Sequence, residues 1–231
     1  MIVIFFILLS FSISLVSFAC IYTIPAARCP NTVVGLPFWF VMVWGPSLAA
    51  IILSAWNHEL ADLLGRAVLV STVPLSVWAL VLAPLAILLL LTPSAPQKPV
   101  PISLGQAATI VGLNLILGPL GEELGWRGLL QEELNHQIGW LETSLLIGVI
   151  WFVWHLPLWT INSPHAQIKL HLFAAHCVLY SVIIGAAYTA SGGSILPAIL
   201  IHLTVNLASS FAVFAGFNTA NAWFRESLFP F

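Results

Sequence analysis

The stretch LGEELGWRG, residues 120–128, places two acids and an arginine within six positions of a chain in which only 6% of the residues are charged. The sequence around it is strongly apolar, with 60% hydrophobic residues and a mean hydropathy of +1.05. Soluble domains are only about half apolar. The composition therefore predicts an all-α fold, a polytopic transmembrane helical bundle, in which this polar stretch is an exception that needs a reason.

Apolar segments long enough to cross a bilayer occur on both sides of the stretch. A transmembrane helix needs about 20 mostly apolar residues, because the hydrocarbon layer is about 30 Å thick. We expect about seven to eight helices, with spans at residues 1–23, 38–56, 67–91, 103–134, 141–161, 166–190 and 195–214. The whole chain, 1–231, is expected to form one integral, multi-pass domain of the cell membrane, with an interfacial tail at 217–231.

Charge and cysteine content exclude other classes of protein. The net charge is −2 and no basic run is present, so we expect the lipid bilayer and not nucleic acid as a partner. Cys20, Cys29 and Cys177 have no paired spacing, which argues against both a disulfide framework and a thiolate zinc site.

The charged stretch itself separates into a pair and a single acid. Charged side chains at membrane depth are costly and normally have partners inside the bundle. On a helix, Glu123 and Arg127 are spaced i,i+4 and can form an ion pair, whereas Glu122 projects about 100° away. A free carboxylate in such a place can accept a proton and activate water. The alternative is a buried ion network that only fixes helix packing.

Most other polar residues lie near the expected ends of spans. We interpret the following charged residues as solvated ends: Glu59, Asp62, Arg66, Glu132, Glu133 and Glu142. We interpret five histidines as structural or solvated: His58, His136, His165, His171 and His176.

Two patterns inside the later spans are different. Trp151 and His155 lie one turn apart in the segment WFVWHLP, and His202 and Asn206 share one helical face at i,i+4. Two convergent polar side chains favour a site, although the second pair is also typical of hydrogen bonds that hold membrane helices together.

In this order, the three motifs resemble those of the CPBP family of intramembrane proteases, also called the ABI family, over about residues 105–215. The family includes the CAAX-processing prenyl endopeptidases. One departure is that its second motif usually begins with phenylalanine, where this chain has Trp151. Because an aromatic ring is retained, we expect the difference not to affect the chemistry.

The resemblance implies an intramembrane endopeptidase that acts on a peptide or protein substrate, with or without a lipid modification. It implies that Glu122 and His155 activate a water, while His202 and Asn206 stabilise the oxyanion as neutral donors. Glutamate and imidazole can move the required protons, and amide and imidazole donors suit a developing negative charge.

Glu123 and Arg127 complete the implied catalytic set by holding the helix and tuning Glu122. Family members are often labelled metalloproteases, and a zinc ion, if present, would be bound by Glu122, His155 and His202. The sequence has no H-E-x-x-H motif, in which two ligands and the base share one helix turn. We therefore favour a metal-independent, glutamate-activated water and leave a divalent metal open.

Two other classes of protein remain as alternatives. A non-catalytic membrane binding or immunity protein could use the same fold, but it would be expected to have lost at least one motif residue, and none is missing. A transporter or channel would spread polar residues along several helices, whereas here they concentrate in three short motifs.

Overall fold

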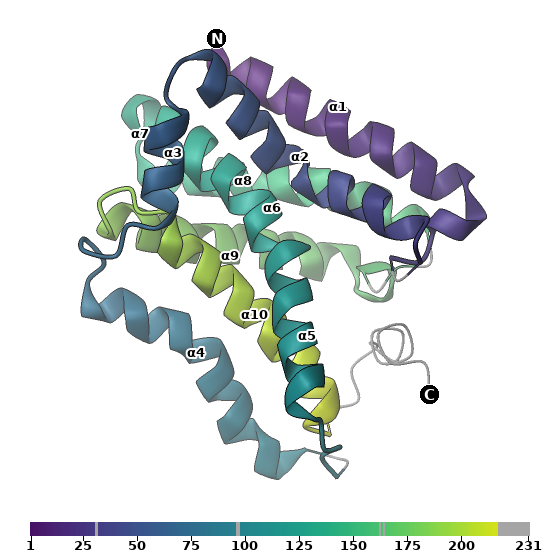
Figure 1. Cartoon of the computed structure of the whole chain (residues 1–231). Helices are drawn as coiled ribbons and strands as arrows, with labels where there is room; N and C mark the ends of the chain where they lie inside the picture. Colours follow the sequence, from purple (N-terminus) through teal and green to yellow (C-terminus); the bar gives the residue numbers. More distant parts are fainter. Residues whose placement is uncertain (31, 96–97, 162, 164, 217–231) are drawn as a thin grey trace.

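The chain forms a bundle of helices (Figure 1). The computed structural model describes residues 1–30, 32–95, 98–161, 163 and 165–216, and these residues contain no strand. Within these described residues, six helical segments are long and apolar enough to cross a membrane: Ile2–Thr23, Gly35–Trp56, Leu75–Ser94, Leu104–Ile138, Trp140–Thr160 and Leu170–Ala190. A shorter apolar helix covers Leu196–Ala212. The predicted all-α, multi-pass membrane bundle is confirmed, while the expected interfacial tail lies outside the described residues.

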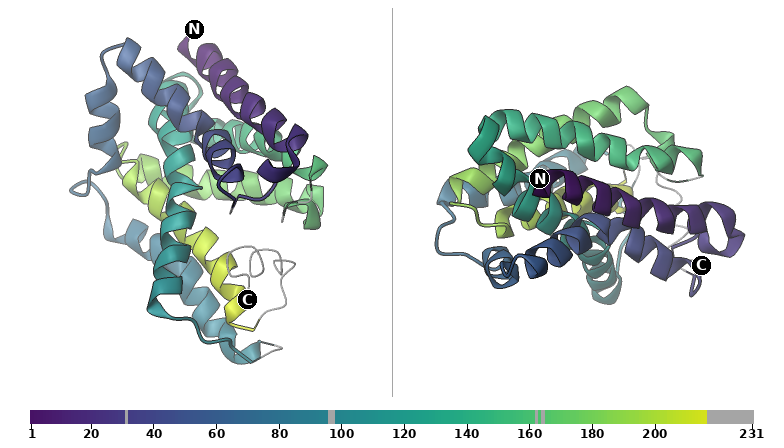
Figure 2. Two further views of the ribbon diagram at one scale, coloured as in Figure 1. Left: turned by 45° about the vertical axis from the view of Figure 1, so that its right-hand side comes forward. Right: turned by 90° about the horizontal axis from the view of Figure 1, so that it is seen from above.

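The helices follow one another along the chain as α1 (Ile2–Thr23), α2 (Gly35–Trp56), α3 (Leu60–Ala67), α4 (Leu75–Leu91), α5 (Leu104–Ile116), α6 (Pro119–Glu123), the π-helix η3 (Leu124–Gln131), α7 (Glu132–Ile138), α8 (Trp140–His155), α9 (Leu170–Ala190) and α10 (Leu196–Phe214). Helices α1 and α2 pack as one pair, and α8 and α9 as another. Helix α10 contacts α4, α5, α6 and α9. Figures 1 and 2 show α4 on the opposite side of the bundle from α1.

The predicted span 103–134 is broken at residues 117 and 118, between α5 and α6. Ser103 caps α5, because its Oγ accepts from the backbone N–H of Gln106 at 3.2 Å. Helix α5 then ends at Ile116, and α6 begins at Pro119, which has no N–H to leave unsatisfied at the start of a helix. The motif residues that follow therefore sit on a separate short helix and the π-helix after it, and π-helical turns are frequent at functional sites.

Helix α2 packs closely against this broken segment through two glycines. A Cβ on Gly125 would lie 2.5 Å from the backbone carbonyl of Pro46, and one on Gly121 would lie 3.0 Å from the carbonyl oxygen of Val43. Small residues four positions apart let the backbones of membrane helices approach closely. Gly121 and Gly125 of LGEELGWRG thus lie at its contact with α2.

We expect Gly125→Ala to destabilise the bundle by about 1–3 kcal/mol, since the new methyl group meets backbone atoms that no side-chain rotation can move. Gly112→Ala in α5 is the matched control, because a Cβ there meets nothing within 4 Å. Denaturant unfolding in detergent measures both variants. Equal unfolding free energies would show that α2 does not approach the backbone at residue 125.

The predicted span 67–91 is wrong at its beginning, because the backbone of residues 68–74 is not helical. The turn between α9 and α10 binds this segment. The N–H of Ile195 donates to the carbonyl of Arg66 at 2.9 Å, and the hydroxyl of Ser194 donates to the carbonyl of Leu69 at 2.6 Å. These carbonyls are therefore held by another part of the chain, and α4 begins only at Leu75.

Arg66 is not the solvated end that the sequence predicted. Its side chain is only 18% exposed. The guanidinium donates to Asp62 at 2.8 Å, to the hydroxyl of Tyr188 at 2.9 Å and to the carbonyl of Gly128 at 2.8 Å. The Tyr188 hydroxyl in turn donates to Glu132. The prediction fails because a long side chain can lie along the protein and bring its charge to distant partners. The guanidinium of Arg66 therefore connects α3 to η3 and α9.

Two later spans also differ in their limits. Helix α8 ends at His155, and Leu156–Thr160 forms a 3-10 helix, in which Pro157 cannot continue the α-helical hydrogen bonding. Helix α9 begins at Leu170 and not at residue 166.

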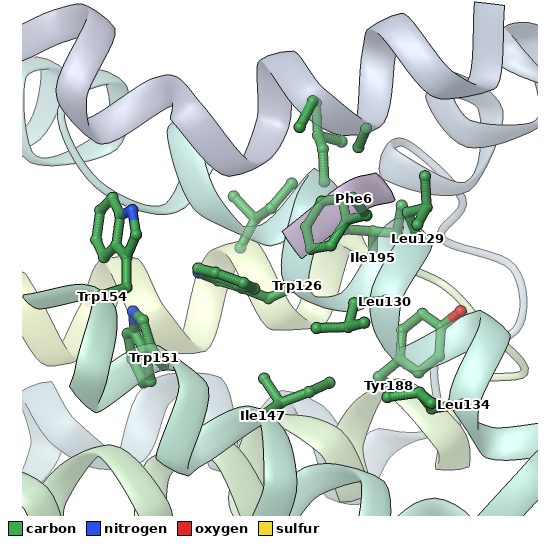
Figure 3. Packing of buried hydrophobic residues seen from close by; sticks show 14 of the residues in the cluster. Phe6, Trp126, Leu129, Leu130, Leu134, Ile147, Trp151, Trp154, Tyr188 and Ile195 are labelled. Atoms are coloured by element: carbon green, nitrogen blue, oxygen red, sulfur yellow. The ribbon is translucent and has the colours of Figure 1, made fainter. Parts of the chain in front are cut away.

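The main cluster of buried apolar side chains runs along η3 and α8 (Figure 3). Figure 3 shows Trp126, Trp151 and Trp154 toward one end of the cluster and Tyr188 toward the other. Trp126 and Trp154 meet edge to face with centroids 6.1 Å apart. Three large indoles therefore pack tightly beside the polar motifs and limit how far the motif side chains can move.

Candidate active site

The structure buries the motif residues and brings them together from separate helices. The exposed fractions are 5% for Glu122, 0% for Glu123, 0% for Arg127, 8% for His155 and 6% for His202. Asn206 is partly buried. These residues come from α6, η3, α8 and α10, so the convergence depends on the tertiary fold and not on one helix face.

Glu123 is the centre of the charged group. Its Oε2 lies 3.1 Å from Nη1 of Arg127, which is the ion pair that the i,i+4 spacing predicted. Its Oε1 lies 2.7 Å from Nδ1 of His202, a contact that the sequence did not predict. Glu123 therefore links the end of α6 to α10 across 79 positions of the chain.

Arg127 reaches beyond the ion pair to two other helices. Its Nη2 donates to the hydroxyl of Ser181 on α9 at 3.1 Å, and this hydroxyl donates to the carbonyl of Ser144 on α8 at 2.7 Å. Sequence reasoning missed Ser181, for which the only signal was a small polar residue within an apolar span. The buried arginine is thus held from several sides, as a buried charge must be.

Glu122 points away from this ion pair, as its helical position predicted. Its Oε2 accepts a hydrogen bond of 2.6 Å from the indole N–H of Trp151. The bond uses one carboxylate oxygen and leaves Oε1 with its own acceptor capacity. Glu122 is thus anchored by one oxygen to α8.

Each of the two motif histidines uses its Nδ1 to bind an acceptor. Nδ1 of His155 lies 2.8 Å from the carbonyl oxygen of Trp151, which can only accept, so Nδ1 carries the proton. In the neutral ring, Nε2 of His155 is then free to accept a proton. His202 is held in the same way by Glu123. A neutral His202 would present an unprotonated Nε2, so it can donate to an oxyanion only when the ring is protonated.

Asn206 lies beside the break between α5 and α6. A Cβ on Gly118 would lie 3.0 Å from Nδ2 of Asn206. His202 and Asn206 occupy one side of α10, as the i,i+4 spacing predicted. Asn206 therefore faces the turn that leads into Glu122, and His202 faces Glu123.

His165, interpreted from the sequence as structural or solvated, lies against His155. The two ring centroids are 5.6 Å apart. Nδ1 of His165 is shielded from solvent and has no hydrogen-bond partner among the described residues. Burial, with a smaller effect of nearby His176, lowers the pKa of His165 to about 4, so this ring is neutral at pH 7. No sequence motif marked its position.

A cavity of about 400 Å³ opens beside His155. Its walls are mainly apolar and come from α1, α2 and the end of α8: Phe11, Ser14, Leu15, Phe18, Met42, Val153, Trp154, His155, Leu156, Pro157, Leu158 and Thr160. Of the six candidate residues, only His155 lines this cavity. Glu122, His202 and Asn206 are not part of its wall.

The expected zinc ligands do not form a metal site in this arrangement. Among the described residues, no group of three or more His, Cys, Asp or Glu side chains is placed to hold a metal ion. One oxygen of Glu122 is bound by Trp151, and Nδ1 of His202 is bound by Glu123. A metal-independent reaction stays the prediction, with a divalent metal left open, and no chemical step below depends on a metal.

Comparison with known proteins places the motifs in a family. Residues 104–208 match the family described as type II CAAX prenyl endopeptidase Rce1-like. Over 101 residues, the chain is 30% identical to CAAX prenyl protease 2 of Methanococcus maripaludis, and the match covers 40% of this chain and 37% of that relative. The chain thus spans little more than a third of the relative's length. All six candidate residues lie inside the matched segment. Residues 104–208 are thus similar to the Rce1-like CAAX prenyl endopeptidase family, and this match agrees with the resemblance to the CPBP proteases.

Proposed function

We propose that this protein is an intramembrane endopeptidase of the CAAX-protease type, which hydrolyses a peptide bond with a water activated by Glu122 and His155. The observation that carries the proposal is the convergence of buried motif residues from four helical segments, in a chain that otherwise has few charges. The match of residues 104–208 to the family supports a peptidase, and the name of the relative supports the CAAX class.

In the proposed reaction, Glu122 accepts a proton from water through the oxygen that Trp151 does not bind. The hydroxide equivalent attacks the peptide carbonyl and forms a tetrahedral oxyanion. The proton that Glu122 took from water then passes through Nε2 of His155 to the leaving nitrogen, the C–N bond breaks, and the products are an amine and a carboxylic acid, which ionises. General acid and base groups contribute about a hundredfold to ten-thousandfold each in such reactions.

Asn206 and His202 are proposed to stabilise the oxyanion. The carboxamide of Asn206 supplies a neutral N–H donor, whereas His202 would donate from Nε2 in its protonated form. Glu123 keeps the His202 ring in one orientation, in the way that a buried carboxylate orients a catalytic imidazole. Loss of one oxyanion donor typically costs about a hundredfold to a thousandfold in rate.

The proposed substrate is a peptide or protein with a prenylated C-terminal CAAX sequence. The cavity beside His155 is the place that we propose for an apolar part of this substrate, since its walls are mainly apolar and His155 forms part of them. A substrate held there would bring a peptide bond next to the imidazole.

The test is a cleavage assay with the purified chain in liposomes and quenched fluorescent peptides. We expect cleavage of a farnesylated CAAX peptide and slower cleavage of the same peptide without its lipid, because the apolar cavity would then stay empty. Chelator is expected to leave the rate unchanged. Absence of cleavage of either peptide by folded protein would contradict the enzyme proposal, and retained peptide binding in that case would favour a non-catalytic binding protein.

A further inference from the structure

The side chain of Trp151 contacts candidate residues that lie on other helices as well as on its own. Its indole N–H donates to Glu122 at 2.6 Å. Its ring meets the ring of His202 at 5.3 Å and that of His155 at 5.8 Å, both edge to face. The guanidinium carbon of Arg127 lies 5.6 Å from the ring centroid. One buried side chain thus touches all three motifs.

The hydrogen bond to Glu122 depends on the indole of Trp151, at the position where the resemblance leads one to expect phenylalanine. A phenylalanine ring could make the aromatic contacts with the two histidines, but it has no N–H to donate. We expected that tryptophan in place of phenylalanine would not affect the chemistry. The hydrogen bond from the indole to Glu122 gives no support to that expectation. A charge-assisted hydrogen bond to a buried carboxylate is among the stronger kinds in proteins.

We propose that Trp151 is a positioning residue, whose indole N–H fixes the carboxylate of Glu122 so that its second oxygen faces the reacting water. This inference rests on the proposed function. Trp151 also restricts the rotamers of Glu122, because the indole that binds the carboxylate cannot move freely. The indole is only 5% exposed and is packed against His155 and His202. Reacting groups that are held in place need no reorganisation during the reaction, and a misplacement of about 1 Å can cost about a hundredfold in rate.

Trp151→Phe tests the proposal because it removes the N–H and keeps an aromatic ring. We expect kcat on the farnesylated peptide to fall about tenfold to a hundredfold, with KM changed less than about twofold. Trp39→Phe is the matched control. It removes an indole N–H that donates to the carbonyl of Ala27 at 3.1 Å, away from the candidate residues. We expect its kcat and KM to stay at the wild-type values.

A second measurement tests the contact without an activity assay. In protein labelled with 15N-tryptophan, the indole N–H resonance of Trp151, assigned by its nuclear Overhauser contacts with the adjacent rings of His155 and His202, should shift in Glu122→Gln and stay in place in Glu142→Gln. An unshifted resonance in Glu122→Gln would contradict the contact, even if Trp151→Phe failed to fold well enough for kinetics.

The outcomes separate this inference from the proposed function. Wild-type protein that cleaves none of the peptides would contradict the proposed function. Active wild type together with an unchanged kcat in folded Trp151→Phe would overturn the positioning role alone. A fall in activity that only matches a loss of folded protein would also overturn it, because a purely structural tryptophan predicts that result.

Discussion

Glu122→Gln is expected to lower kcat about a hundredfold to ten-thousandfold, because the amide cannot accept the proton of the attacking water. The amide oxygen can still accept the hydrogen bond from Trp151, so the packing around the indole should persist. Initial rates on the farnesylated peptide in liposomes, normalised to folded protein, measure the effect. We expect KM to stay close to the wild-type value, because the substitution changes the base and not the cavity.

Glu142→Gln provides the control for this experiment. Glu142 is exposed in the first turn of α8, and its substitution removes one carboxylate without touching the candidate site. We expect wild-type kinetics for this variant. If Glu122→Gln retained the wild-type kcat, Glu122 would not be the base and the proposed mechanism would have to be abandoned.

Arg127→Ala is expected to destabilise the bundle by about 3–5 kcal/mol, since it leaves the buried charge of Glu123 without its cationic partner. The variant also loses the bond from Arg127 to Ser181, which connects η3 to α9. The free energy of unfolding, measured by denaturant titration in detergent, and the yield of folded protein both report the loss.

Two further variants show whether the charge is the cause. Glu123→Gln combined with Arg127→Met removes both charges and should recover part of the lost stability, because a buried pair can often be replaced by uncharged groups of similar volume. Arg28→Ala removes an exposed arginine that donates to the carbonyl of Tyr22, and we expect little change. A fully stable Arg127→Ala would show that the ion pair does not hold the helices together.

Much of the fold followed from the sequence because hydrophobic length is a direct consequence of membrane thickness. The pairing of Glu123 with Arg127 was predicted because it depends on two residues that are only four positions apart. The start of α4 and the burial of Arg66 were not predicted, because they depend on residues far along the chain, such as Ile195 and Tyr188.

The candidate site shows the same division. Local spacing placed His202 and Asn206 on one side of α10, but it could not show that Glu123 binds His202. The donation from Trp151 to Glu122 joins positions 29 apart, and the contact of Arg127 with Ser181 joins positions 54 apart. Such contacts form only when the helices pack against one another, so composition and periodicity cannot predict them.

The central claim is that this bundle hydrolyses a peptide bond with a water that Glu122 activates. Mass spectrometry of peptide cleaved in H2(18)O tests it most directly, with wild type and Glu122→Gln compared at equal amounts of folded protein. We predict one 18O atom in the new carboxylate from the wild type and almost no labelled product from Glu122→Gln. Equal labelled product from both proteins would contradict the account.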